Sequence, residues 1–447
     1  MLRNRMSLCD QVRGPLLQLS RYTHLWYTCY RHFRDVYGFP RGYGTLLIRQ
    51  RCIAIAFKGS ASAPERRQEC GFAREPSPRW IIPSSVPLGR NNQMQPIWNY
   101  WAQDDLTTML KEFMYTLYFR HLSVNPKDRR VVVVESVLCP TLFRNTVAQV
   151  LFEHFEVPAI VFVPSHLMAL YTLGINSALV LDCGYYESIS LPVYEGVCIL
   201  SAWQAIPLGG LAIHRRVESE LMELATVRGS SDGEFSLAEV LTDPIRESVL
   251  EDIKVRTCFV TTRERALKLQ VWGFARSNNA EVIPDPPPPP PEVKYPLDGD
   301  KIITIPGSLR EYAAEALFEL DGDMKSIATL LLDSILKAPM DSRKVLAQNI
   351  VVMGGSSMMP GFKHRLLQEL KSLVQDPTYS RKMNMNTFKF HSPPSKENYT
   401  AWLGASIYGS TDAVNVHCIT KDQFITNNRH IPDWSDQAWQ ALSSKTA

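Results

Sequence analysis

Two strand-like segments of this chain end in glycine turns of a kind that could hold phosphate. Residues 178–184 close on Asp182 and Gly184, and residues 349–355 close on two glycines. Glycine lets the backbone turn with positive φ and leaves room for phosphate to approach the amide groups. An aspartate at a strand end can also hold the hydrated cation that accompanies a polyphosphate. The two turns therefore favour a nucleotide site, although glycine also ends many buried strands without binding anything.

Other common site motifs are absent from the sequence. There is no GxxxxGK[ST] loop and no GxGxxG opening a helix, so P-loop and Rossmann sites are not supported. The nine cysteines include no CxxC pair and no Cys/His cluster, a pattern typical of reduced thiols in a cytosolic protein. No apolar stretch reaches the roughly 18 residues that a membrane span requires, so we expect no membrane insertion.

The net charge of +3 is unevenly distributed along the chain. Residues 1–70 contain twelve Lys/Arg and four Asp/Glu, a balance of +8, so the remaining residues sum to −5. This basic segment lacks the motif of a nucleic-acid-binding module, and we expect no nucleic-acid partner. Its arginine content also resembles an organelle transit peptide, which is the less favoured alternative. Residues 1–68 show no sustained periodicity and are predicted to be a divergent basic segment, with disorder and an alternative exon as the two explanations.

Strand and helix signals alternate from about residue 68 and predict an α/β fold. Apolar residues at helical spacing predict a helix over residues 106–117. The valine run at 131–134 predicts a strand that is buried on both faces. A helix over 143–155, a strand over 159–163 and a helix over 165–173 continue the alternation, which is the pattern of helices layered on a sheet.

Two further segments were weighed as binding sites. Residues 284–291 include six consecutive prolines, which adopt extended polyproline II and cannot form a helix or a central strand. We interpret them as a surface insertion, with a docking motif for an SH3-type partner as the alternative. His214-Arg215-Arg216 is interpreted as a solvated helix face rather than as an anion site.

Four motifs stand out between about Gly71 and Phe424: residues 152–159 (FEHFEVPA), 178–184 (ALVLDCG), 354–361 (GGSSMMPG) and 401–406 (AWLGAS). Together they resemble the actin family. The resemblance implies a two-lobed α/β fold with a reduced outer subdomain. Lobe 1 would comprise 69–172 plus 399–447, and lobe 2 would comprise 173–398, with the proline-rich insertion at 284–291.

The resemblance also implies ATP or ADP with Mg²⁺ between the lobes. Asp182 would face the hydrated metal, and Lys254 would lie beside the adenosine. Carried over by position, the nucleotide-binding residues are Asp182, Gly184, Gly209, Gly210, Lys254, Gly354, Gly355, Ser356 and Met358.

The positions that the family uses for hydrolysis differ in this chain. Ser165 stands where the family has its catalytic glutamine, and Ile189 stands where it has a water-orienting histidine. The family's first phosphate loop, an Asp-x-Gly turn ahead of Gly71, has no visible counterpart. Hydrolysis requires a positioned water and stabilised phosphate charge. We therefore predict no catalytic residues, and slow or absent hydrolysis.

Within the family the chain most resembles the actin-related proteins that end the short filament of dynactin. Residues 118–122 (YFRHL), 164–170 (PSHLMAL) and 431–434 (IPDW) carry this resemblance. The interval between Gly71 and Tyr118 is shorter than in actin, where it forms the outer subdomain that grips the next subunit. The resemblance implies a structural subunit of the cytoplasm and cytoskeleton that caps the pointed end and contacts filament subunits, other pointed-end subunits and, indirectly, dynein. The alternatives are an active ATPase or phosphotransferase of the same fold and a nuclear actin-related subunit of a chromatin complex.

Overall fold

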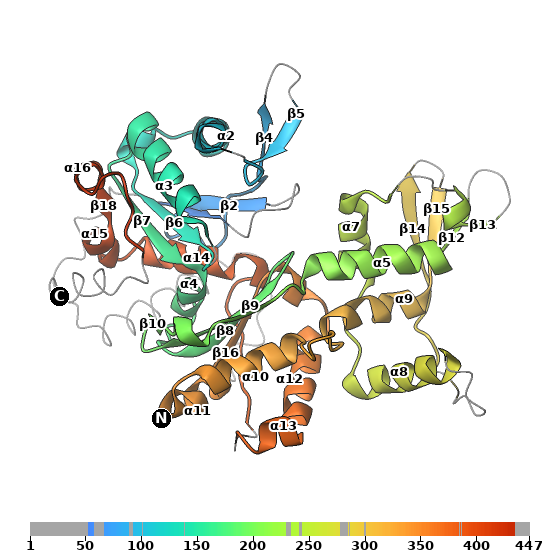
Figure 1. Cartoon of the computed structure of the whole chain (residues 1–447). Helices are drawn as coiled ribbons and strands as arrows, with labels where there is room; N and C mark the ends of the chain where they lie inside the picture. The colour runs from blue at the N-terminus through green and yellow to red at the C-terminus, as the bar shows by residue number, and fades with distance from the viewer. Residues whose placement is uncertain are drawn as a thin grey trace, which may run out of the picture. The chain divides into compact units, whose positions relative to one another are not determined.

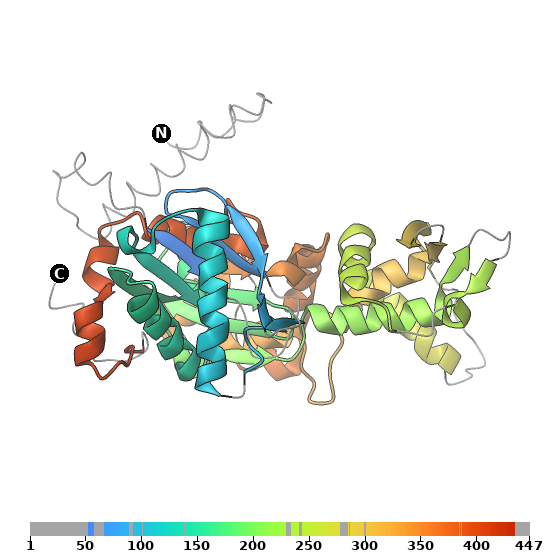
Figure 2. The ribbon, with the colours of Figure 1, turned by 90° about the horizontal axis from the view of Figure 1, so that it is seen from above.

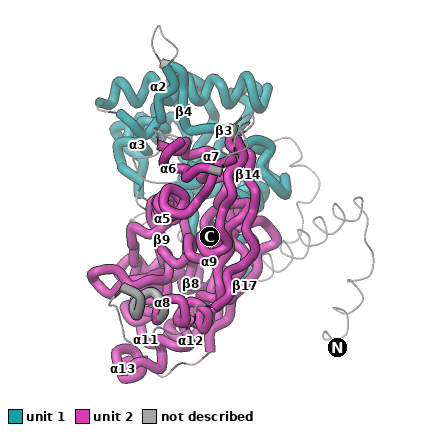
Figure 3. Tube along the Cα trace, turned by 90° about the vertical axis from the view of Figure 1, so that its right-hand side faces the viewer, with its two compact units in different colours: residues 1–175, 401–447 teal, residues 176–400 magenta. Residues whose placement is uncertain are grey.

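The protein was analysed as a computed structural model, shown in Figure 1. It describes residues 52–57, 67–88, 93–100, 102–137, 139–228, 234–240, 244–277, 285, 287–298, 301–383, 385 and 387–433. The chain forms two compact units, coloured separately in Figure 3: unit 1 comprises residues 1–175 and 401–447, and unit 2 comprises residues 176–400. Each unit has its own apolar core.

Unit 1 is built on a six-stranded sheet with the order β18-β7-β6-β1-β2-β3. Strands β1, β6 and β7 pair in parallel, whereas β2, β3 and β18 join the sheet antiparallel. The strands are β1 (Ile53–Ala56), β2 (Arg67–Phe72), β3 (Trp80–Pro83), β6 (Val131–Glu135), β7 (Ala159–Pro164) and β18 (Ile419–Thr420).

Helices cover both faces of this sheet. Figure 1 shows α2 and α3 on one side and α4 and α14 on the other, and alternate residues of β1 and β6 enter the core on the α2–α3 side. The unit 1 helices and helical turns are α2 (Gln103–Tyr115), η1 (Thr116–Leu122), η2 (Pro126–Asp128), α3 (Thr141–Gln149), η3 (Val150–His154), α4 (Ser165–Tyr171), α14 (Thr400–Tyr408), α15 (Ala413–His417) and α16 (Lys421–Thr426). The predicted helix–strand alternation between residues 106 and 173 is confirmed, and the valine strand β6 is buried on both faces.

Strand β1 corrects the expectation for the start of the chain. Residues 1–68 were expected to be a divergent segment, but residues 53–56 form a buried strand between β2 and β6. The run Ile-Ala-Ile-Ala was missed because it is short and alanine has little intrinsic preference for strands. The described part of unit 1 therefore begins at residue 52, before Gly71.

The segment between β3 and α2 is small. It contains a two-stranded antiparallel ribbon, β4 (Ser85–Leu88) and β5 (Gln93–Pro96), which forms no part of the six-stranded sheet. Val86 is buried and packs with the unit 1 core, so the ribbon is anchored at its base. Residues 89–92 between the two strands lie outside the described part of the chain.

Unit 2 contains two sheets. The larger has the order β10-β9-β8-β16-β17, with β11 paired to β9, and the smaller has the order β13-β12-β15-β14. In the larger sheet β8 and β16 run parallel. The strands are β8 (Ala178–Cys183), β9 (Ser188–Tyr194), β10 (Val197–Cys198), β11 (Gln204–Ile206), β12 (Thr226–Arg228), β13 (Glu234–Ser236), β14 (Val293–Asp298), β15 (Lys301–Ile305), β16 (Ile350–Met353) and β17 (Phe390–His391).

Helices surround both unit 2 sheets, and Figure 2 shows α5 leading directly toward the smaller sheet. The apolar helix α10 packs among α11, α12 and the larger sheet, and its residues are almost all buried. The helices and helical turns are η4 (Leu200–Ala202), α5 (Gly210–Leu224), α6 (Leu237–Val240), α7 (Glu247–Thr257), α8 (Arg263–Ser277), α9 (Gly307–Tyr312), η5 (Ala313–Leu317), α10 (Ile327–Lys337), α11 (Met340–Gln348), η6 (Gly355–Met358), α12 (Phe362–Leu373), α13 (Pro377–Ser380) and η7 (Glu397–Tyr399).

The described part of the proline run is attached to unit 2. Arg265 donates to the carbonyl of Pro288 at 2.6 Å, and Arg310 donates to that of Pro291, also at 2.6 Å. Gly307 is required here, because a Cβ atom at this position would lie 1.6 Å from the carbonyl oxygen of Pro290. Two arginines and a glycine of α8 and α9 thus hold an extended segment at the surface.

Two features are absent from the described residues. No helix there has the length and apolar character of a membrane span. The same residues contain no group of three His, Cys, Asp or Glu side chains placed to hold a metal ion.

Candidate functional site

The two predicted glycine turns meet in unit 2. Because β8 and β16 are parallel neighbours with Asp182 paired to Met353, the turns that follow them lie at the same edge of the sheet. Gly354 has φ +97°, and a Cβ atom there would lie 2.3 Å from the carbonyl oxygen of Cys183 and 2.7 Å from Oδ1 of Asp182. A side chain at 354 would therefore force the turns apart.

The start of α5 joins the same cluster. The amide of Gly210 donates to the carbonyl of Gly184 at 3.1 Å, and the Ser356 hydroxyl donates to the same carbonyl at 2.8 Å. A Cβ atom at Gly209 would lie 2.5 Å from the carbonyl oxygen of Tyr185. The glycines thus allow three chain segments to approach one another closely.

Lys254 reaches this cluster from α7. It is only 5% exposed, and its Nζ lies 3.5 Å from where a Cβ atom of Gly210 would stand. Met358 closes η6 with 42% of its surface exposed, whereas Gly355 faces open space at its Cβ position. The structure therefore gathers the predicted glycines, Asp182, Ser356 and Lys254 in one place, with Met358 at the end of the same turn.

Four polar side chains at this cluster form a hydrogen-bonded chain that was not predicted from the sequence. Tyr185 Oη lies 3.2 Å from Nδ1 of His214, and His214 Nε2 lies 2.8 Å from Oε2 of Glu251. Lys254 Nζ pairs with the Glu251 carboxylate and lies 3.1 Å from His214 Nε2. We call Tyr185, His214, Glu251 and Lys254 the ionic network.

The electrostatics of the ionic network keep Glu251 charged. Burial alone would raise the pKa of its carboxyl, but the His214 hydrogen bond and the Lys254 charge outweigh burial and lower that pKa to about 2. Burial raises the pKa of Tyr185, so the phenol stays protonated. The interpretation of His214 as part of a solvated face was wrong, since only 2% of this residue is exposed. The i, i+3 spacing of Glu251 and Lys254 was the available sequence signal.

Some features of this cluster in unit 2 fit a bound nucleotide, and others do not. Gly354 has the positive φ that a phosphate-binding turn uses, whereas Gly184 does not. The amides of Gly184 and Gly354 already donate to the carbonyls of Glu187 at 3.0 Å and Glu397 at 2.9 Å. Lys254 is already paired within the ionic network, and the Tyr185 ring lies 3.0 Å from the Cβ position of Gly210. The space beside most of these glycines is filled by the chain's own backbone. A nucleotide bound here would therefore lie against turns that are already formed and against side chains that already have partners within the chain.

The positions aligned with the family's hydrolytic residues carry no equivalent chemistry. Ile189 is 4% exposed within β9. Ser165 starts α4 in unit 1, and its hydroxyl lies 3.2 Å from Nδ1 of the buried His166. Residues 58–66, which connect β1 to β2 and contain Lys58-Gly59-Ser60, lie outside the described residues. We derive no hydrolytic step from this arrangement.

The fold and the site define a class: an α/β protein of two units, one of which carries paired glycine turns at the end of parallel strands. The profile of the family Actin matches residues 67–430, and the chain belongs to this family. Its fold is accordingly the actin-like α/β fold, as the sequence predicted. Proteins of this fold typically bind a nucleotide with a divalent metal.

A curated relative supports the placement within the family. Actin-related protein 10 of Dictyostelium discoideum is 28% identical over 440 residues, which covers 83% of this chain and 87% of the relative. The resemblance to the actin-related branch that was stated from the sequence is confirmed by these two matches.

Proposed function

We propose that this chain is a structural actin-related subunit that caps the pointed end of dynactin's actin-like filament and so supports dynein-driven transport along microtubules. The similarity to Actin-related protein 10 over most of both chains supports membership of this branch. The proposed location is the cytoplasm and cytoskeleton. The proposed direct partners are the terminal filament subunit and the other pointed-end subunits.

The observation that carries the capping role is the small region between β3 and α2. It consists of the β4–β5 ribbon, where actin has a larger outer subdomain that grips the next subunit. A filament grows by repeating one head-to-tail contact, and each subunit must supply both halves of that contact. A subunit with a reduced outer half accepts a neighbour on one side and does not propagate the filament on the other.

We further propose that any bound nucleotide is structural. The turn at Asp182–Gly184 would lie beside its phosphates, with Asp182 facing the hydrated Mg²⁺. The turn of Gly354, Gly355, Ser356 and Met358 would hold the adenosine beside Lys254, and Gly209 and Gly210 would lie near the nucleotide. Ser165 and Ile189 offer no means to orient a water, which supports a role other than catalysis.

The test is recovery of the tagged full chain from cell extract, with the tag alone as the control. We expect mass spectrometry to identify dynactin filament and pointed-end subunits, and electron microscopy of a tag label to place it at one filament end. Nucleotide released by denaturing the eluate should be ATP or ADP, with no turnover by the purified chain. Recovery of an ATPase without filament subunits would instead support the enzyme alternative. Recovery of chromatin subunits from nuclei would support the third alternative.

A further inference from the structure

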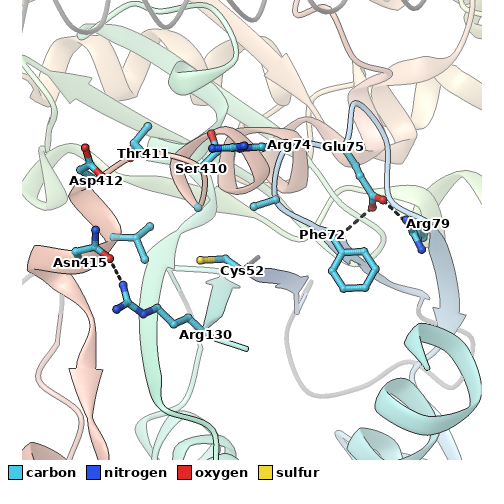
Figure 4. A pocket seen from close by; sticks show the side chains of 13 residues that line it. Cys52, Phe72, Arg74, Glu75, Arg79, Arg130, Ser410, Thr411, Asp412 and Asn415 are labelled. Carbon is cyan, nitrogen blue, oxygen red and sulfur yellow. Dashed lines mark hydrogen bonds and ion pairs between the residues drawn. The ribbon is translucent and has the colours of Figure 1, made fainter. Parts of the chain in front are cut away.

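Unit 1 contains a cavity of about 350 Å³ that the proposed capping role does not use (Figure 4). One wall runs from Phe72 at the end of β2 to Arg79, and the other runs from Gly409, just after α14, to Asn415 in α15. Cys52 and Arg130 lie between these walls in Figure 4. We call this cavity the basic pocket.

Three guanidinium groups line the basic pocket, from Arg74, Arg79 and Arg130. Arg79 is held by Glu75 at 2.5 Å, so its charge is largely neutralised. Arg130 donates to the side-chain oxygen of Asn415, a neutral amide. Arg74 is exposed at the rim, and Figure 4 shows its side chain beside Ser410.

Two further observations connect these arginines to the cavity. Burial raises the pKa of the Cys52 thiol, and the positive charges of Arg130 and Arg74 oppose that rise. The two guanidinium groups therefore act electrostatically on Cys52, which lines the cavity. Arg74 also has φ +79°, a backbone conformation that non-glycine residues seldom adopt. Strained residues of this kind cluster at functional sites, because a binding role is one reason to retain them.

The charge balance selects the class of ligand. The lining contains three arginines and two acids, Glu75 and Asp412, which leaves one excess positive charge. One carboxylate neutralises this excess, whereas a phosphate dianion would overcompensate it and meet Asp412. The lining also includes apolar surface from Phe72, Ala73 and Val414, which suits the methylene groups of a glutamate. A cavity of this size lies at the lower end of the range for ligand sites and suits a short segment.

We propose that the basic pocket binds an acidic peptide segment of a partner protein, with one carboxylate held between Arg74 and Arg130. Arginine presents a planar fork of donors that matches a carboxylate in two hydrogen bonds. Ser410 and Thr411 supply hydroxyl groups at the same wall. The peptide's methylene groups contact Val414 and Ala73.

Fluorescein-labelled hexaglutamate titrated with the full-length chain tests this proposal by anisotropy. Arg74→Gln should weaken binding about tenfold, the size expected for the loss of a charge-assisted hydrogen bond. Arg120→Gln, which removes an exposed arginine of η1 outside the pocket, is the matched control and should leave affinity unchanged. Asp412→Asn should strengthen binding several-fold, because it removes an opposing charge. Because residues 1–70 are also basic, the test compares the hexaglutamate affinity of R74Q with that of R120Q.

A diazirine-labelled hexaglutamate locates the probe directly. We expect photo-crosslinks to residues 72–79 and 409–415, and far fewer with hexaglutamine at matched ionic strength. Equal affinity of R74Q and R120Q, or crosslinks confined to other segments, would overturn the proposal. Displacement by inorganic phosphate at lower concentration than by acetate would show a phosphoryl site and would also overturn it. None of these outcomes depends on dynactin recovery, so the two proposals fail separately.

Discussion

The basic pocket of unit 1 and the ionic network of unit 2 use similar side chains in opposite ways. In the pocket, Arg74 and Arg130 line a cavity that carries an excess positive charge. In the network, the buried cation of Lys254 is paired with Glu251 and lies beside His214. A charge paired inside the fold is costly to leave without its partner, whereas an excess of positive charge around a cavity attracts an external anion. We therefore expect substitutions in the basic pocket to change ligand binding, and substitutions in the ionic network to change the stability of the fold.

The largest expected effect comes from disrupting the close packing of the two glycine turns beside the ionic network. Gly354→Ala places a Cβ atom 2.3 Å from the Cys183 carbonyl oxygen at φ +97°, and should lower the free energy of unfolding by about 3 kcal/mol. Gly355→Ala is the matched control, because nothing lies within 4 Å of its Cβ position. Thermal unfolding followed by circular dichroism measures both. Equal midpoints for the two variants would show that the turns are not tightly packed.

The pH dependence of stability tests the network itself. The pKa of Glu251 is lowered from 4.5 to about 2, so its contribution is complete above pH 4.5 and is lost as the pH falls toward 2. Because 47% of its side chain is exposed, screening limits this contribution to about 1 kcal/mol. Glu251→Gln should remove that part of the acid dependence in thermal melts between pH 2 and 7. Glu264→Gln, an 82% exposed glutamate on α8, should change it far less, and similar curves for both variants would refute the assignment.

Tyr185→Phe sharpens the comparison, because it removes the hydroxyl that bonds to His214 and Glu247 and keeps the ring. Loss of the Tyr185–His214 contact should cost about 1 kcal/mol of stability. Denaturant unfolding of the purified chain measures it, with Tyr115→Phe at a half-exposed position of α2 as the control. An unchanged unfolding midpoint for Y185F would mean that the phenol contributes packing alone.

The smallest expected effect comes from changing Glu75, the carboxylate that neutralises Arg79 in the basic pocket. Glu75 accepts hydrogen bonds from Arg79 and from the amide of Phe72, so Glu75→Gln frees the Arg79 charge. Hexaglutamate affinity should rise about threefold, since charge-assisted pairing strengthens when the competing carboxylate is removed. Asp105→Asn makes the same charge change at an exposed position of α2 and is the control in the anisotropy assay. A fall in affinity for E75Q would show that Glu75 positions the pocket rather than neutralising it.

The sequence predicted many elements because they depend on local patterns. The valine run of β6 and the apolar spacing of α2 are short-range signals, and both elements form where they were expected. Strand β1 was missed, since its residues become a strand only through pairing with β2 and β6. The glycine turns after β8 and β16 were predicted singly, and their meeting follows from the parallel pairing of these strands.

The amino-acid sequence by itself determined the family, the α/β class and the glycine positions, because these depend on residue identity along the chain. Only the tertiary structure decided which polar side chains pair with one another and which line a pocket. His214, Glu251 and Lys254 lie up to 40 residues apart, and only folding brings them into one hydrogen-bonded group. Arg74 and Asn415 line one pocket although more than 300 residues separate them. Hydrogen bonds and charge pairs act over a few ångströms in space, and a sequence records distance only along the chain.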